Sequence, residues 1–292
     1  MIKLSLIIPA KDVNDRKLKE LLSSIHKQDF QAQEMEVLVI TEGTSESAKA
    51  IGIRRAKGNV IGFLASDNEL IGSDFLMSHY QNALFQGAAY PLKYFHSMAD
   101  DILNRYFALI GGNDPLAYYM RKNDRASYLG DGRFTTGGSI GDNGFFITAS
   151  LIKKTDLDNY YHIDNAIEAN ASPVVTSYTI WHKTGGNIFK FFCKRYKYGF
   201  QHSFNKNRRW HLVDFKQPKD VMRLICFIVC SVTIMEPLCL SIRGYLKVRD
   251  IAWFIHPLIS ILTVFTYGLL SINIACLKLY QSLFAPMVAR RV

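Results

Sequence analysis

One acidic residue lies at a point where the sequence pattern would allow a diphosphate to bind. Asp67 follows the apolar run over residues 60–64, just past the end of an expected buried strand. A carboxylate at such a point can hold Mg²⁺ or Mn²⁺ against a diphosphate, because hard cations take oxygen ligands and usually share them with phosphates. The same cation would stabilise a departing diphosphate. Taken alone, Asp67 is equally typical of a turn or a helix cap.

Two further carboxylates and one histidine are candidates for chemistry later in the chain. Asp164 and Glu168 are one helical turn apart, and either could take a proton from an attacking hydroxyl. Asp164 is also placed to cap the helix that would follow it. His182 comes after a strand-like run over 174–181. An imidazole there is as typical of an exposed loop as of a metal site.

The elements that must position these residues alternate through the first ninety residues. Apolar runs cover 4–8, 37–40 and 60–64, and helix-prone segments at 18–25 and 48–56 separate them. Short continuous apolar strands between amphipathic helices indicate a parallel sheet covered on both faces. Ligands of such sheets bind beyond the carboxyl ends of the strands. The loops after the three runs are therefore the first places to look for a site.

The charge of the chain points to an anionic partner. The formal net charge is +10, and no acidic residue occurs between Glu168 and Asp214, where basic residues alternate with aromatic ones. This composition is typical both of a nucleic-acid surface and of a collar beside a membrane. Because the stretch leads directly into apolar segments, which have no role in binding nucleic acid, we expect an anionic membrane and no nucleic acid. The five cysteines show no metal-ligand spacing and are expected to act as small hydrophobic side chains.

Two apolar segments close the chain. Residues 221–242 contain only Arg223 and Glu236 as charged side chains, and residues 251–277 contain none. About 20 apolar residues span a bilayer as a helix, so we expect a hairpin with both ends cytosolic, since more positive charge lies outside the turn than within it. Helices lying in the membrane interface and a buried soluble pair are the alternatives. Glu236 would need a partner or an interfacial position.

The opening of the chain predicts which side of the membrane the first domain occupies. The apolar run that ends before Pro9 is too short for the hydrophobic region of a secretory signal. We therefore expect the catalytic part on the cytoplasmic side.

Four motifs in order resemble the family-two glycosyltransferases of the GT-A fold. Residues 4–10 resemble the opening strand of that family, and residues 36–44 its second strand, which usually ends in Asp-Asp-Gly-Ser. Residues 49–58 are similar to its Arg-Asn-x-Gly…Ala-x-Gly helix, and the next strand leads to Asp67 at the end of the DxD position. The order and spacing of the four motifs carry the resemblance; each motif singly is weak.

The resemblance implies a nucleotide-sugar donor site. The residues that it assigns to donor binding are Pro9, Ala10, Glu42, Lys49 and Asp67. It implies that Asp67 is a direct metal ligand and that His182 completes the metal site. Ala65 stands where the first Asp of DxD is expected, which leaves the cation short of a ligand unless Asn68, Glu69 or a water substitutes.

The same resemblance places the catalytic base. Residues 161–168 stand where the family has its Glu-Asp base motif, with Asp164 at the catalytic position and Ile163 in place of the Glu. Glu168 is the alternative base. The Arg209-Trp210 pair is similar to the QxxRW motif of processive synthases, but Lys206 occupies the Gln position. We interpret Trp210 as an interfacial anchor.

Together these patterns predict an α/β protein with a GT-A sheet, mostly parallel and flanked by helices, plus C-terminal transmembrane or interfacial helices. We expect a GT-A catalytic domain over 1–205 and a basic collar with a membrane hairpin over 206–292. The predicted enzyme transfers a hexose with inversion from a nucleotide-diphosphate donor to a lipid-linked saccharide or polyprenyl phosphate, as in cell-envelope glycan biosynthesis, with Mg²⁺ or Mn²⁺. The alternative is a catalytically degenerate nucleotide-binding or scaffold protein at the membrane.

Overall fold

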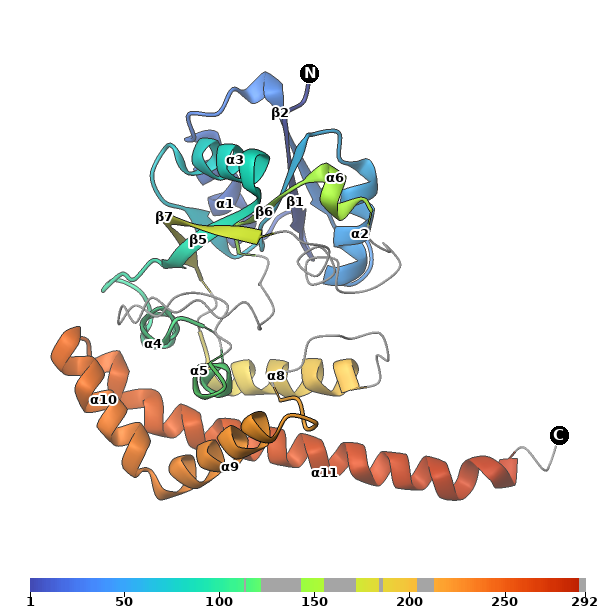
Figure 1. The fold of residues 1–292 in the computed structure, drawn as a ribbon, viewed down its shortest axis with the longest axis vertical. Coiled ribbons are helices and arrows are strands. Elements are labelled where there is room, and N and C mark those ends of the chain that lie inside the picture. The colour runs from blue at the N-terminus through green and yellow to red at the C-terminus, as the bar shows by residue number, and fades with distance from the viewer. Residues whose placement is uncertain (113, 122–142, 155–171, 184–185, 204–212, 289–292) are drawn as a thin grey trace.

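The chain folds into a sheet with covering helices and, beside it, a layer of helices built mainly from the C-terminal third (Figure 1). This computed structural model describes all residues except 113, 122–142, 155–171, 184–185, 204–212 and 289–292.

The first three strands form where the sequence predicts them. They are β1 (Leu4–Pro9), β2 (Met35–Ile40) and β3 (Val60–Phe63), joined by α1 (Arg16–His26), the 3-10 turn η1 (Ala32–Glu34) and α2 (Ser45–Arg55). β1 pairs in parallel with both β2 and β3. Parallel pairing brings the carboxyl ends of the three strands to one edge of the sheet, as expected for a ligand-binding edge.

The rest of the sheet is mixed rather than parallel throughout. Its strands are β4 (Asn68–Leu70), β5 (Gly87–Tyr94), β6 (Phe145–Thr148) and β7 (Ser172–His182). The strand order of the seven-stranded sheet is β2-β1-β3-β6-β5-β7-β4. β6 runs antiparallel to both of its neighbours, and β4 runs antiparallel to β7. The α/β class with flanking helices is confirmed, with antiparallel strands inserted beside the expected parallel ones.

Helices cover both faces of the sheet, as the continuous apolar strands predict. On one face α1 and α3 (Phe75–Gln86) enclose a core that includes Leu6, Leu21 and Phe146. On the other face α2 and α6 (Ala149–Ile152) enclose a second core around Ile7 and Phe145. The two cores explain why β1 lacks the alternation of apolar and polar residues that a half-exposed strand shows. Both of its sides are buried.

The sequence patterns do not predict two helices of the middle region. They are α4 (Ile102–Ile110) and α5 (Pro115–Tyr119). Most residues of α4 are buried. Asp101 and Asp114 cap the two helices through their carboxylates.

The C-terminal apolar segments form helices, and the first of these segments is bent. The helices are α8 (Ile188–Ser203), α9 (Pro218–Thr233), α10 (Met235–Lys247), the 3-10 turn η2 (Ile251–Ile255) and α11 (His256–Val288). The first apolar segment is not one helix, because the chain bends by 84° between α9 and α10. Ile234, at the bend, has a left-handed backbone with φ of 62°. A continuous helix would bring the Pro237 ring against the carbonyl of Thr233.

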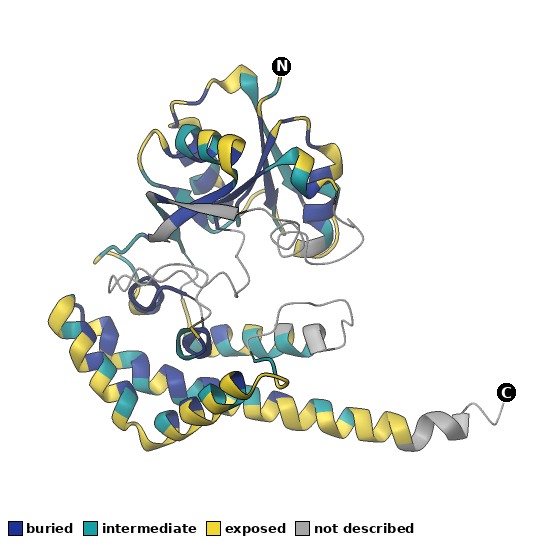
Figure 2. Cartoon of the chain, viewed as in Figure 1, coloured by how far each residue is buried: buried dark blue, intermediate teal, exposed yellow. Residues whose placement is uncertain are grey.

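One helix among the described residues is long and apolar enough to cross a membrane. It covers Ile251–Ser282, and a second span arises only if the bent pair α9 and α10 is counted as one. Length and composition of this kind are weak evidence for a span, because core helices of soluble proteins share them. Unlike a core helix, however, α11 has 22% of its most apolar window buried, and its C-terminal half projects away from the rest of the molecule (Figure 2).

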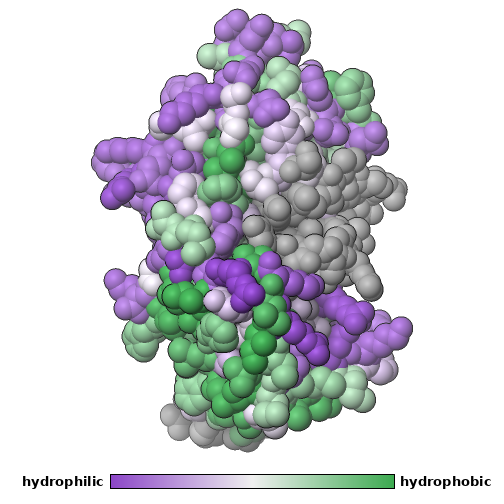
Figure 3. All heavy atoms as spheres, turned by 90° about the vertical axis from the view of Figure 1, so that its left-hand side faces the viewer, coloured by the Kyte–Doolittle hydropathy of each residue, from purple (hydrophilic) through white to green (hydrophobic). Residues whose placement is uncertain are grey.

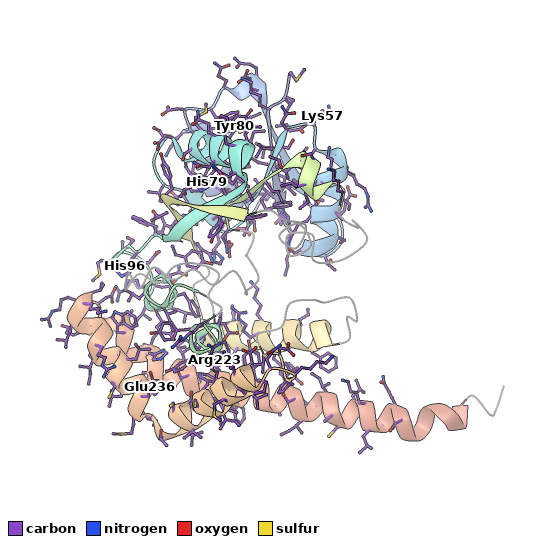
Figure 4. The ribbon with its side chains drawn as sticks, in the orientation of Figure 1. Lys57, His79, Tyr80, His96, Arg223 and Glu236 are labelled. Carbon is purple, nitrogen blue, oxygen red and sulfur yellow. The ribbon has the colours of Figure 1, made fainter. Side chains whose placement is uncertain are left out.

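Buried polar contacts join the helical layer to the sheet. His96, two residues past β5, places Nε2 2.7 Å from Oδ2 of Asp250, and Arg105 of α4 lies 3.3 Å from the same oxygen (Figure 4). Asp250 is fully buried and also accepts the backbone N–H of Ala252 at the start of η2. Around this contact, side chains of α4, α8 and η2 form an apolar core. The helical layer is therefore packed against α4.

Candidate active site at the β4–β7 edge

The structure brings Asp67 and His182 together. Asp67 precedes β4, and His182 is the last residue of β7; the antiparallel register of the two strands pairs Asn68 with His182. Oδ1 of Asp67 lies 3.3 Å from Nε2 of His182. The backbone N–H of Lys183 donates to the Asp67 carbonyl at 2.8 Å. The two residues, 115 positions apart in sequence, are thus held by the strand ladder itself.

The surroundings of Asp67 favour its ionised form. Burial alone would raise the pKa of this carboxyl group, but the charge and hydrogen bond of His182 outweigh it, and Lys17 and Lys194 add positive charge. The pKa of Asp67 is therefore held well below its usual range. Lys17 belongs to α1 and Lys194 to α8, so the sheet domain and the helical layer both contribute positive potential here. An anionic ligand would be attracted to this potential.

A chain of buried amides supports the loop that carries Asp67. Asn68 accepts the backbone N–H of Ala65 at 2.8 Å and donates to the Asn143 side chain at 2.9 Å. Asn143 in turn donates to the Tyr94 hydroxyl at 3.2 Å, and the Tyr94 ring contacts the His182 ring with centroids 5.3 Å apart. Sequence reasoning missed Tyr94 and Asn143; the only signal was that Asn143 lies in the glycine-rich stretch before β6.

The residues present fit a divalent cation that is shared with phosphate. Two ligand atoms of a six-coordinate Mg²⁺ or Mn²⁺, each at about 2.1 Å, lie about 3 Å apart, which is close to the 3.3 Å between Asp67 and His182. No group of three or more His, Cys, Asp or Glu side chains with metal-site geometry occurs among the described residues. A cation here would take its other ligands from phosphate and water, as Mg²⁺ usually does.

Neither Asn68 nor Glu69 is placed to substitute for the carboxylate that is missing at Ala65. Both polar atoms of the Asn68 side chain are used in the buried amide chain. The Glu69 carboxylate lies 2.5 Å from Nζ of Lys183, which also contacts Glu20 of α1 at 2.8 Å. Water is therefore the remaining substitute for that ligand.

The residues assigned to the nucleoside lie at the other side of the same sheet edge. Pro9 ends β1, and the N–H of Ala10 donates to the Ile40 carbonyl at 3.0 Å, which holds the ends of β1 and β2 together. Glu42 is mostly exposed, with its carboxylate 3.3 Å from the Arg55 guanidinium of α2. Lys49 is buried on α2. Asp164 and Glu168, with the base motif, lie outside the described residues.

Comparison with solved structures identifies the fold. The mannosyltransferase PcManGT from Pyrobaculum calidifontis, solved with GDP-Man and Mn²⁺, superimposes with a TM-score of 0.51 over 91% of this chain and 86% of its own, at 10% identity. Likeness at this identity establishes the fold alone, and the expected GT-A-like fold is confirmed. No protein-family model and no curated sequence matches the chain.

Structures of TarS from S. aureus superimpose more loosely. The TarS chain matches with a TM-score of 0.39 and 13% identity over 68% of this chain. Its residues 1–349 with UDP-GlcNAc match with a TM-score of 0.38. This chain spans 40% of the length of the full TarS chain, and at these TM-scores TarS says nothing further about it.

Proposed function

We propose that the chain is an inverting, family-two glycosyltransferase that moves a sugar from a nucleotide-diphosphate donor to a membrane-bound acceptor. One observation carries the proposal: in a GT-A-like fold, Asp67 and His182 meet at the ligand-binding edge with a spacing that suits a cation shared with phosphate. The fold is shared with PcManGT, whose structure holds GDP-Man and Mn²⁺. The proposed division into a catalytic domain over 1–205 and a membrane part over 206–292 follows from the same assignment.

The donor would lie along the edge formed by the carboxyl ends of β1, β2 and β3 and the start of β4. The nucleoside would occupy the side of Pro9, Ala10 and Glu42, and the diphosphate the side of Asp67. Positive potential from Lys17 and Lys194 favours an anionic group beside Asp67. When bound by Asp67 and His182, Mg²⁺ or Mn²⁺ neutralises charge on the departing nucleoside diphosphate.

The transfer step needs a base only for a neutral acceptor. The acceptor oxygen attacks the anomeric carbon, the bond from that carbon to the diphosphate oxygen breaks, and the nucleoside diphosphate leaves. If the acceptor is a hydroxyl, we propose that Asp164, or else Glu168, takes its proton. If the acceptor is a polyprenyl phosphate, its oxygen is already ionised, and Asp164→Asn would leave most of the activity in place.

The deciding experiment is donor hydrolysis by the detergent-purified full chain. UDP-, GDP- and dTDP-sugars are supplied with and without Mn²⁺, and Asp67→Ala is compared with Asp29→Ala, an exposed carboxylate that contacts Ser73. We expect one nucleotide to be released with Mn²⁺, unchanged in Asp29→Ala and lost in Asp67→Ala. Equal release by both variants would contradict a donor site at Asp67.

One observation favours a second function, in which the chain binds nucleotide at the membrane without catalysis. Ala65 stands where a carboxylate of the cation site is expected. A donor that binds with micromolar affinity but is not turned over with any lipid acceptor would support this alternative.

A further inference from the structure

The bend between α9 and α10 makes an apolar wedge on the outside of the molecule. At its vertex Val232, Ile234 and Met235 are 66%, 42% and 68% exposed. Figure 1 shows the two helices as arms that meet at this vertex, on the side of the helical layer away from the sheet. A monomeric soluble protein rarely exposes such large apolar side chains in one contiguous patch.

Each arm of the wedge carries one apolar outer face. Along α9 the exposed apolar residues Met222, Ile225 and Val229 follow helical spacing, as do Leu238 and Ile242 along α10. In Figure 3 hydrophobic atoms gather over the lower half of the molecule, where these helices lie, while the upper half is mostly hydrophilic. The outer faces and the vertex therefore form one continuous apolar surface.

The inner face of the wedge is attached firmly to the helices beside it. The Ser241 hydroxyl donates to the Trp253 carbonyl at 2.8 Å. Gly244 lets α10 lie directly on the Trp253 ring, because a Cβ there would lie 2.3 Å from it. Phe227 of α9 is buried against α5 and α11 side chains. The wedge is thus part of the packed structure and keeps its shape.

The two charged residues within the apolar segment face inward. Glu236 accepts a hydrogen bond from the Tyr119 hydroxyl of α5, and Arg223 donates to the Met120 carbonyl at 3.2 Å (Figure 4). The partner that Glu236 requires in an apolar setting is therefore supplied by α5. Neither charge interrupts the outer apolar face.

Several polar groups at the vertex are paired within the chain. The Thr233 hydroxyl donates to the carbonyls of Val229 and Cys230 at 2.9 and 3.2 Å, within the last turn of α9. The Ile234 carbonyl accepts the N–H of Leu238 at 2.9 Å, and Pro237 has no N–H to satisfy. Pairing of this kind suits a bend in lipid, because no water is present there to pair with backbone groups.

The exposed positive charges lie toward the open ends of the arms. The exposed charged residues from 215 to 249 are all basic: Lys216, Lys219, Arg243, Lys247 and Arg249. The acidic residues of the same stretch, Asp220 and Glu236, are not exposed. Cations at one level and apolar side chains below them match the headgroups and acyl chains of an anionic bilayer.

The dimensions of the wedge fit one leaflet. At 1.5 Å per residue, α9 with 16 residues and α10 with 13 residues are about 24 and 20 Å long. If the two arms slope equally, each is inclined to the membrane plane by half of the 84° bend. The vertex then lies roughly 13–16 Å below the arm ends. Half of a hydrocarbon core is about 15 Å. The vertex would therefore reach the middle of the bilayer and return.

We propose that α9 and α10 form a re-entrant wedge in one leaflet of an anionic bilayer, with residues 216 and 249 on the same side as the sheet domain. This replaces the spanning hairpin expected from the sequence. The inference rests on the membrane attachment in the proposed function but not on sugar transfer, and its test uses no donor. Failure of the wedge proposal can therefore be distinguished from failure of the proposed sugar transfer.

The test is cysteine accessibility of the full chain in proteoliposomes that contain phosphatidylglycerol. The native cysteines are replaced, and single cysteines are placed at Lys216, Met235, Arg249 and, as a reference on the sheet domain, Lys57. A charged, impermeant maleimide is added to intact vesicles. We expect positions 216 and 249 to react to the same fraction as position 57, and position 235 to react only after detergent is added.

Two results would overturn the wedge. If position 249 reacts only in the fraction of molecules in which position 57 does not, the segment crosses the bilayer. Labelling at 235 equal to that at 57 in intact vesicles would mean that the vertex lies in water, as expected if another protein covers this face.

A second measurement uses vesicle flotation. Val232→Glu with Met235→Glu should weaken binding about tenfold or more, while Phe85→Glu, an equally exposed apolar side chain on α3, should not. Lys219→Glu with Arg243→Glu should weaken binding to anionic vesicles about fivefold per charge. Unchanged binding in both double variants would contradict the proposal.

Discussion

Asn68 of β4 stands opposite His182 of β7, and this single pairing sets the Asp67 carboxylate 3.3 Å from the His182 imidazole. The candidate site is therefore built into the ladder between an edge strand of only three residues and a strand of eleven. A short edge strand is held by few ladder bonds. The side chains that support β4 should consequently matter as much to the site as the ligands themselves.

His182→Ala should weaken Mn²⁺ binding in the presence of a nucleoside diphosphate. Replacing a residue that only supports a ligand typically costs 10–100-fold in metal affinity, so loss of a direct ligand should cost at least about tenfold. Isothermal titration on the purified chain measures the effect. His26→Ala, at the exposed end of α1, is the matched control. Unchanged affinity in His182→Ala would remove His182 from the cation site.

The ion pair of Asp67 should contribute stability only above acidic pH. The pKa of the Asp67 carboxyl is lower in the folded chain than in the unfolded chain, so its contribution is complete above the unfolded value of about 4 and is lost as the pH falls through the folded value. We expect the stability difference between the native chain and Asp67→Asn to shrink as the pH falls below 4. Thermal unfolding across this range measures it; a difference that grows on acidification would reverse the assignment.

Asn68→Ala should loosen the loop that carries Asp67. The substitution leaves the Ala65 N–H and the Asn143 amide without their partner, and each unsatisfied buried group costs about 1–3 kcal/mol. We expect a loss of about 2–4 kcal/mol in the free energy of unfolding, together with weaker donor binding. Asn82→Ala, whose amide donates to the Ser78 carbonyl within α3, should change donor binding little. Denaturation in mild detergent and donor titration separate the two effects.

Two glycines of the helical layer should respond in opposite directions to alanine. A Cβ at Gly244 would lie 2.3 Å from the Trp253 ring, so Gly244→Ala should destabilise by about 1–3 kcal/mol. A Cβ at Gly268, inside α11, would have no neighbouring atom within 4 Å, and Gly268→Ala should stabilise by about 0.5–1 kcal/mol. Thermal unfolding in detergent compares them. Equal shifts would contradict close packing of α10 on η2.

Asp250→Ala should separate the helical layer from the sheet. The substitution leaves Arg105 and His96 without a buried carboxylate and removes the cap of η2. Breaking a buried ion pair by removing one partner costs about 3–5 kcal/mol. Limited proteolysis should then cleave before η2, whereas Asp12→Ala, an exposed control, should keep the native pattern. Native-like resistance in Asp250→Ala would show that the apolar contacts suffice.

Part of the candidate site was within reach of the sequence. Asp67 and His182 were both predicted, Asp67 because it follows a buried strand and both because of the family resemblance. Their contact was not predictable, because it depends on β4 pairing with β7 across 115 residues. Tyr94 and Asn143 were missed, since a buried amide and a phenol carry no pattern in a single sequence.

The apolar strands and helix periodicity of the first ninety residues determined by themselves that this end is an α/β domain. Strands that are buried on both faces need apolar residues at successive positions, and such runs are visible in the sequence. The apolar tail likewise determined that a hydrophobic surface exists. Only the tertiary structure decided how these parts are used. It inserted β6 antiparallel between β3 and β5, joined Asp67 to His182, and bent the expected membrane helix at Ile234. Such choices depend on contacts between residues far apart in sequence, and local patterns do not encode them.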